Sequence, residues 1–211
     1  FVPSGVYDAD GADGDDFRTV GGDYYKPTDA DYEANCDEAR QLLADAGYPN
    51  GEGFPVVEYL YNTSDAHKAV AEALQFMWEE ELGVKVTLNN QEWAAFLQTR
   101  KDGDYSIARN GWIADYNDPI SFLDMWMTGG GNNDAQYAND DYDALIKQAK
   151  TTTDNAERMD LLHQAEDKLI GEDSVLAPLY FYTQKYMLAD GIEGMYYCPL
   201  GYFFFGYTHQ A

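Results

Sequence analysis

The pattern of apolar and polar positions between residues 54 and 109 switches repeatedly between the period of a strand and that of a helix. Apolar residues dominate 54–61 and alternate with polar residues in 84–88, so we predict a strand in each segment. Residues 65–82 repeat apolar positions at helical spacing. This predicts a long amphipathic helix with a buried stripe of Val70, Ala73, Leu74, Met77 and Trp78. Gly83 is the residue type that ends such a helix.

A second helix and a third strand complete this pattern. One helical face is formed at positions i, i+3, i+4 and i+7 by Trp93, Phe96, Leu97 and Arg100. Tyr105, Ile107 and Arg109 then alternate along a strand. Strands that alternate with helices in this order predict βαβ units whose crossovers share one hand. The centre of the chain is therefore predicted to be an α/β lobe.

A helix is also predicted before this region, at residues 36–46, with Asn35 as a possible cap and Gly47 and Pro49 as its end. Residues 1–34 show no period.

Two more helices and a strand are predicted after it. The first, 141–150, has an apolar face of Tyr142, Leu145, Ile146 and Ala149. Asp154, followed three residues later by Glu157, predicts the start of the second, which runs to about Gly171. Residues 175–184 are apolar but contain a proline, so we predict a strand at the edge of a sheet.

The tail of the chain, 195–207, is rich in aromatic residues, namely Tyr196, Tyr197, Tyr202, Phe203, Phe204, Phe205 and Tyr207. Exposed together, such rings favour aggregation. We therefore expect them to be covered by the lobe or by a neighbouring molecule.

Composition narrows the class of partner. The 211 residues include 13 basic and 38 acidic side chains, a formal net charge of −25. Nucleic acids and anionic membrane surfaces attract clustered Lys and Arg, so we predict no nucleic-acid partner. No apolar run is long enough to span a bilayer. The chain opens at Phe1 without a signal segment, and we interpret it as a piece of a longer protein.

The sequence favours a protein without cofactor, metal or catalytic site. It lacks nucleophile elbows, zinc-binding helices and phosphate-binding glycine loops. The acidic run in 8–16 invites a calcium-loop interpretation, but Ala12 and Thr19 stand where ligands are required. Cys36 and Cys198 have no metal or redox spacing, and a disulfide between them is left open.

The strongest candidate for binding chemistry is Asp115, in a loop with Trp112, Ile113 and Tyr116. The loop follows the third predicted strand, and α/β sheets bind ligands beyond the carboxyl ends of their strands. Asp118 and Pro119 then predict a helix start. From the residues alone Asp115 either caps a turn or forms an ion pair with a ligand ammonium.

The same stretch carries a resemblance to a known family. Its motif residues are Glu92-Trp93, Phe96-Leu97, Arg100, Ala108-Arg109, Gly111-Trp112 and Ala114-Asp115-Tyr116-Asn117. This run resembles the C-terminal part of extracytoplasmic oligopeptide-binding proteins, the peptide-capturing subunits of ABC importers. The resemblance extends from about Cys36 to about Tyr182.

The resemblance implies a fold and a division of the chain. The fold is the C-terminal lobe of a two-lobe, class II periplasmic-binding-protein-like α/β architecture, with a mixed sheet flanked by helices. Residues 36–183 would form the ligand-binding lobe and 1–35 a segment of the hinge or the other lobe. Residues 184–211 would be a tail that returns to the other lobe.

The resemblance also implies roles for individual residues. Asp115 would hold the amino terminus of a peptide, with Trp112 and Ile113 beside the ligand. Trp93, Arg100, Arg109, His67 and Tyr182 match pocket positions of the family. For Trp93 and His67, packing against the fold is an equal alternative, and for Arg109 we favour an ion pair with an acidic residue.

The function implied is capture of short peptides between two lobes and delivery to a membrane permease, without catalysis. The partners would be the peptide, the permease and the missing N-terminal lobe. The location would be the periplasm, or the cell surface as a lipid-anchored lipoprotein. A carrier of another solute, such as a sugar or a chelated metal, is the alternative within the fold. A carboxylate-pair hydrolase is the alternative from another class.

Overall fold

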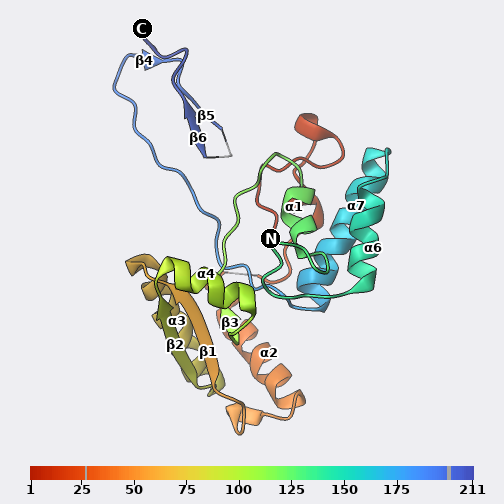
Figure 1. The fold of residues 1–211 in the computed structure, drawn as a ribbon, viewed down its shortest axis with the longest axis vertical. Helices are drawn as coiled ribbons and strands as arrows, with labels where there is room; N and C mark the ends of the chain where they lie inside the picture. Colours follow the sequence, from red (N-terminus) through yellow and green to blue (C-terminus); the bar gives the residue numbers. More distant parts are fainter. Residues whose placement is uncertain (27, 199–200) are drawn as a thin grey trace. The chain divides into compact units, whose positions relative to one another are not determined.

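The computed structural model describes residues 1–26, 28–198 and 201–211 (Figure 1). The chain folds as two compact units. The first consists of Phe1–Gly22, Trp112–Asn133 and Tyr137–Ala211, and the second of Asp23–Gly111 and Asp134–Gln136. The boundaries predicted at 35/36 and 183/184 concern lobes of a longer protein and stay a prediction.

The second unit is built on a three-stranded sheet. β1 (Val57–Asn62) lies between β2 (Val86–Gln91) and β3 (Ile107–Ala108). α3 (Asp65–Leu82) connects β1 to β2, and α4 (Trp93–Asp102) connects β2 to β3. The connection from β1 to β2 and the connection from β2 to β3 run in opposite directions across the sheet. Because such connections are right-handed, α3 and α4 lie on opposite faces of the sheet (Figure 1). The βαβ order is confirmed, and the sheet expected to be mixed is parallel at both of its described pairings.

The buried face of α3 differs in part from the predicted stripe. Ala71 is fully buried, and Trp78 packs against the same cluster of sheet residues. Ala73 and Met77 are exposed, so the prediction is wrong at these two positions. The buried face runs through Ala71, Leu74 and Trp78, at positions i, i+3 and i+7, and Ala73 and Met77 lie to one side of it.

α2 (Tyr32–Asp45) begins earlier than predicted and is followed by η2 (Pro49–Gly51). Asn35 therefore lies inside the helix, and its prediction as a cap is wrong. Its side-chain amide donates instead to the carbonyl of Lys26, at 3.0 Å. The helix ends before Gly47, as predicted.

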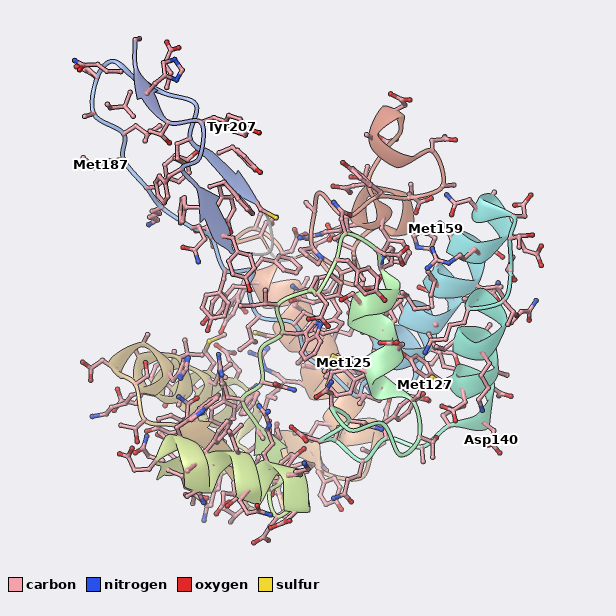
Figure 2. All side chains as sticks on the ribbon, turned by 45° about the horizontal axis from the view of Figure 1, so that its top comes forward. Met125, Met127, Asp140, Met159, Met187 and Tyr207 are labelled. Atoms are coloured by element: carbon pink, nitrogen blue, oxygen red, sulfur yellow. The ribbon has the colours of Figure 1, made fainter. Side chains whose placement is uncertain are left out.

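The first unit is mainly helical around one buried core. Its elements are η1 (Gly11–Asp13), α1 (Phe17–Gly21), α5 (Ile120–Leu123), η3 (Asp124–Trp126), α6 (Asp140–Ala149), α7 (Asn155–Glu166) and the π-helical η4 (Asp167–Glu172). The predicted face of α6 is confirmed, and Asp154 caps α7 by accepting the N–H of Glu157. Figure 2 labels Met125 and Met159, both of which are buried in this core.

Residues 175–184 form no strand, which corrects the prediction made from their apolar character. They run without ladder pairing among the described residues, and the proline at 178 removes one of the N–H groups that a ladder needs. The chain ends in two short antiparallel pairs. β5 (Tyr196–Cys198) pairs with β6 (Tyr202–Phe204), and β4 (Ile192–Glu193) pairs with β7 (His209–Gln210).

The aromatic rings of this tail contact one another and expose much of their surface. Tyr196 and Phe204 stack at 4.7 Å between centroids. The exposed fractions of Tyr202, Phe205 and Tyr207 are 64, 63 and 79% (Figure 2 labels Tyr207). The expectation that the lobe covers the tail is therefore wrong for these three rings, and cover from a neighbouring molecule stays a prediction. Residues 199 and 200 of the tail lie outside the described residues.

Cys36 and Cys198 are both free thiols. Among the described residues, no helix is long and apolar enough to cross a membrane.

Candidate ligand-binding site

The structure divides the predicted site residues equally between the two units. The second unit holds His67, Trp93, Arg100 and Arg109. The first unit holds Trp112, Ile113, Asp115 and Tyr182.

Three of the candidates in the second unit follow the carboxyl ends of neighbouring parallel strands. His67 lies near the start of α3 after β1, Trp93 opens α4 after β2, and Arg109 follows β3. The N–H of Arg109 donates to the carbonyl of Leu60 on β1 at 2.8 Å. The three side chains therefore start from one edge of the sheet, the edge at which α/β folds bind ligands.

Trp93 offers an aromatic surface at this edge. It is 53% exposed, and its ring stacks on the fully buried Phe96, with centroids 5.8 Å apart and an interplanar angle of 27°. One face of the indole is thereby fixed against the protein. Much of the remaining surface is accessible to a ligand.

His67 and Arg109 interact electrostatically. Burial lowers the pKa of His67 below its ordinary 6.5, and the positive charge of Arg109 lowers it further. A hydrogen bond with the backbone of Asn62 acts in the opposite direction and raises this pKa. Burial raises the pKa of Tyr59, while Arg109 acts in the opposite direction. A neutral His67 beside the Arg109 cation gives this edge a positive character.

Arg100 has partners inside the second unit. Its Nε lies 2.7 Å from an Asp134 carboxylate oxygen, and both side chains are largely buried. Its Nη1 donates to Asn110 at 2.8 Å, and the guanidinium lies over the ring of Phe96 at 5.1 Å. Arg100 thus forms an ion pair within this unit, and a ligand contact would use its remaining guanidinium donors. The ion pair expected for Arg109 stays a prediction.

Asn62 and Gln91 are site candidates that the sequence interpretation missed. They are register partners at the carboxyl ends of β1 and β2. The Oδ1 of Asn62 and the Oε1 of Gln91 are buried and have no hydrogen-bond partner among the described residues. Buried acceptors of this kind usually bind a water or a ligand donor. The available signal was a polar residue at the last position of each apolar strand.

In the first unit, the loop after Gly111 alternates between core and solvent. Trp112 and Ala114 pack against the buried core, whereas Ile113 and Asp115 are exposed, with Ile113 at 68%. The Trp112 indole N–H donates to the Ser121 carbonyl at 2.7 Å, and the Asp115 N–H donates to the Ser121 Oγ at 2.9 Å. The Asp115 carboxylate is thereby presented to solvent from an anchored backbone.

Tyr116 of this loop lies among charged side chains. Burial raises the pKa of Tyr116, and the carboxylates of Asp124, Asp118 and Asp115 raise it further, against the charge of Arg158. Of these carboxylates, Asp118 is paired with Arg158 and Asp124 with Lys150. Among the described residues, no cluster of three or more His, Cys, Asp and Glu could hold a metal ion.

Tyr182 is 63% exposed and lies in the segment without strand pairing. Its ring meets that of Tyr180 edge-on at 5.2 Å, and the two hydroxyls are 3.3 Å apart. Phe181, between these two tyrosines, is 40% exposed and has the Arg18 guanidinium over its ring.

Comparison with known proteins identifies the family of this chain. The family model described as "Bacterial extracellular solute-binding proteins, family 5 Middle" matches residues 5–134. The dipeptide-binding protein DppE of Bacillus subtilis (strain 168) is 39% identical over 191 residues, which cover 90% of this chain and 34% of DppE. The chain thus spans about a third of that relative's length.

A solved structure and a relative named for another solute extend the comparison. The crystal structure of Haemophilus influenzae OppA in complex with the peptide RPPGFSPFR matches with a TM-score of 0.67 at 34% identity. The match covers 75% of this chain and 31% of that one. The probable deoxycholate-binding periplasmic protein YgiS of Escherichia coli (strain K12) is 38% identical over 156 residues, 74% of this chain and 29% of YgiS. The chain therefore belongs to family 5 of the bacterial extracellular solute-binding proteins.

Proposed function

We propose that this chain is part of the peptide-binding subunit of an ABC importer. In this proposal Asp115 binds the α-ammonium group of a short peptide, with Ile113 and the backbone of the loop beside it. An α-amino group is largely protonated at neutral pH, and a carboxylate binds it through charge-assisted hydrogen bonds. The observation that carries the proposal is the exposed Asp115 carboxylate on an anchored backbone.

The second unit, taken by itself, carries further residues that we propose as ligand contacts. Trp93 supplies an aromatic wall for a side chain. Arg109 and the remaining donors of Arg100 suit carboxylates and carbonyls, and His67 contributes a neutral imidazole. Tyr182 contributes an exposed phenol from the first unit. An extended peptide can also pair with backbone amides, which gives affinity without regard to its sequence.

The remaining parts of the proposal concern the whole protein. A second lobe, contributed by the rest of a longer chain, would close over the ligand on a hinge, and the closed form would deliver the peptide to a membrane permease. The protein would act outside the cytoplasm, in the periplasm or anchored by lipid at the cell surface. It would bind its ligand without catalysing a reaction.

A carrier of another solute is the second candidate, and the likeness to YgiS favours it. That relative is 38% identical and is named for deoxycholate, a ligand that has a carboxylate and lacks an amine. Asp115 would repel such a ligand, whereas it would attract a peptide amino terminus. The presence of an amine in the bound ligand therefore separates the two candidates.

The test is mass spectrometry of ligands released from the full-length protein that contains this chain. Wild type is compared with Asp115→Asn and with Asp160→Asn, a matched change at an exposed aspartate of α7. We expect short peptides in the wild type and in Asp160→Asn, and their loss from Asp115→Asn. Peptides retained equally by all three would remove Asp115 from the site. A ligand without an amine would support the second candidate.

A further inference from the structure

Ser121 is hydrogen-bonded to both ends of the segment that carries the proposed peptide anchor. Its carbonyl accepts the Trp112 indole N–H at 2.7 Å, and its Oγ accepts the Asp115 backbone N–H at 2.9 Å. Ser121 itself is only 4% exposed. One buried residue of α5 thus holds the first and the last residue of the segment 112–115.

The position of Ser121 is fixed by the packing of α5. Ile120, Phe122 and Leu123, its neighbours in the helix, are all buried in the core of the first unit. Asp118 caps the helix, since its side chain accepts the Ile120 N–H at 2.9 Å and its carbonyl accepts the Ser121 N–H at 3.1 Å. The backbone of Ser121 is therefore held in place by the core and by the cap of the helix.

We infer that Ser121 is a positioning residue for ligand binding, which orients the Asp115 carboxylate by fixing the backbone N–H of the same residue. The inference rests on the proposed function of Asp115. An ion pair between a carboxylate and an ammonium gains its full strength only in a narrow range of distances and angles, so the residues that orient the carboxylate contribute to affinity. An exposed loop without this hydrogen bond would sample other orientations and would lose more freedom on binding.

A structural role alone would have a different signature. A hydroxyl that merely satisfies a backbone N–H affects the stability of the fold and lowers affinity for every ligand alike. A residue that orients Asp115 affects the recognition of the amino terminus selectively. The ratio of affinities for a free peptide and for its N-acetylated form measures that recognition.

The experiment measures this ratio by calorimetry in the full-length protein, for one peptide prepared in both forms. The variants are Ser121→Ala, Asp115→Asn and Tyr142→Phe. Tyr142→Phe is the control, because the Tyr142 hydroxyl makes a buried hydrogen bond to the carbonyl of Leu123, also in α5, at 2.5 Å. It removes a hydrogen bond from the same helix without touching the loop. Thermal unfolding of each variant reports the loss of stability separately.

We expect wild type and Tyr142→Phe to prefer the free peptide to the same extent, and Asp115→Asn to lose the preference. Ser121→Ala should reduce it by about fivefold, the factor that corresponds to one ordinary hydrogen bond. Its affinity for the acetylated peptide should be unchanged. A preference retained in Ser121→Ala but lost in Asp115→Asn would overturn the inference and leave the proposed function intact. No preference in the wild type would overturn the proposed function itself.

Discussion

Arg158 of α7 holds Asp118 with two parallel hydrogen bonds, from Nη1 at 2.9 Å and from Nη2 at 2.8 Å. Both side chains are more than three-quarters buried, with exposed fractions of 18 and 24%. The Asp118 oxygen that accepts Nη2 also accepts the Ile120 N–H at the start of α5. One ion pair therefore connects α7 to the start of α5, whose Ser121 is hydrogen-bonded to the loop 112–115.

Replacing Arg158 should destabilise the first unit in proportion to the hydrogen bonds lost. Arg158→Lys removes the paired geometry but keeps the charge, and should lower the free energy of unfolding by about 1 kcal/mol. Arg158→Met leaves the Asp118 carboxylate without its partner and should cost about 2 to 3 kcal/mol. Urea unfolding measures both. Lys147→Met is the control, since Lys147 is exposed and its ion pair with Asp143 spans 3.6 Å. If Lys147→Met and Arg158→Met lowered the free energy of unfolding equally, the structural role of the Arg158–Asp118 ion pair would be contradicted.

The coupling between Arg109 and His67 predicts a shift in a titration. Arg109→Gln removes a positive charge that lowers the pKa of His67, so that pKa should rise toward 6.5. An NMR titration of the His67 ring measures it. Arg40→Gln is the matched control, because the charges that act on His67 include Arg109 and not Arg40. An unchanged pKa of His67 in Arg109→Gln would mean that the two side chains do not interact.

The same shift has a consequence for stability. The pKa of His67 is lower in the folded state than its ordinary value, so protonation favours the unfolded state. The stability contribution is complete above 6.5 and is lost as the pH falls from there through the folded pKa. Arg109→Gln should make this loss smaller, measured by urea unfolding at about pH 7.5 and about pH 5. His67→Gln, which cannot titrate, gives the baseline for each protein.

The Arg100–Asp134 pair separates a structural role from a ligand role. Both side chains are largely buried, with exposed fractions of 13 and 14%. Either Arg100→Met or Asp134→Asn should therefore cost about 2 to 3 kcal/mol of stability. Peptide affinity should fall further in Arg100→Met, because only that variant removes the guanidinium donors proposed for the ligand. Equal affinities in the two variants would assign Arg100 to the fold alone.

Local signals predicted the elements that they specify directly. Gly83 ends α3, and the Asp154 side chain caps α7 as its spacing with Glu157 indicates. The sequence-based predictions were wrong for segments whose secondary structure depends on contacts with distant parts of the chain. Asn35 could have capped a helix, but the helix continues past it to Tyr32. An apolar segment such as 175–184 becomes a strand only if a neighbouring strand pairs with it.

The candidate site likewise contains residues that local sequence signals identify and residues that only the folded structure identifies. Asp115 could be selected because the loop, its aromatic neighbours and the family motif coincide in one short stretch. Ser121 could not, because a serine in a four-residue helix has no distinguishing pattern and acts through a fixed position in space. Asn62 and Gln91 become neighbours only through the strand register. Residues that support a site are thus harder to predict than residues that would contact the ligand.

The aromatic tail should behave differently in this isolated chain and in the longer protein. Tyr202, Phe205 and Tyr207 are each more than 60% exposed here, as is Phe76 on α3, which serves as the control. Serine at the three tail positions should reduce the binding of a hydrophobic dye, and self-association, in the isolated chain, because exposed rings drive both. In the full-length protein the same variant should instead lose stability, by about 1 kcal/mol or more for each ring that becomes buried. Phe76→Ser should leave the stability of both proteins within about 0.5 kcal/mol, as an exposed position does. A triple variant as stable as wild type in the full-length protein would show that the rest of that protein does not cover the tail.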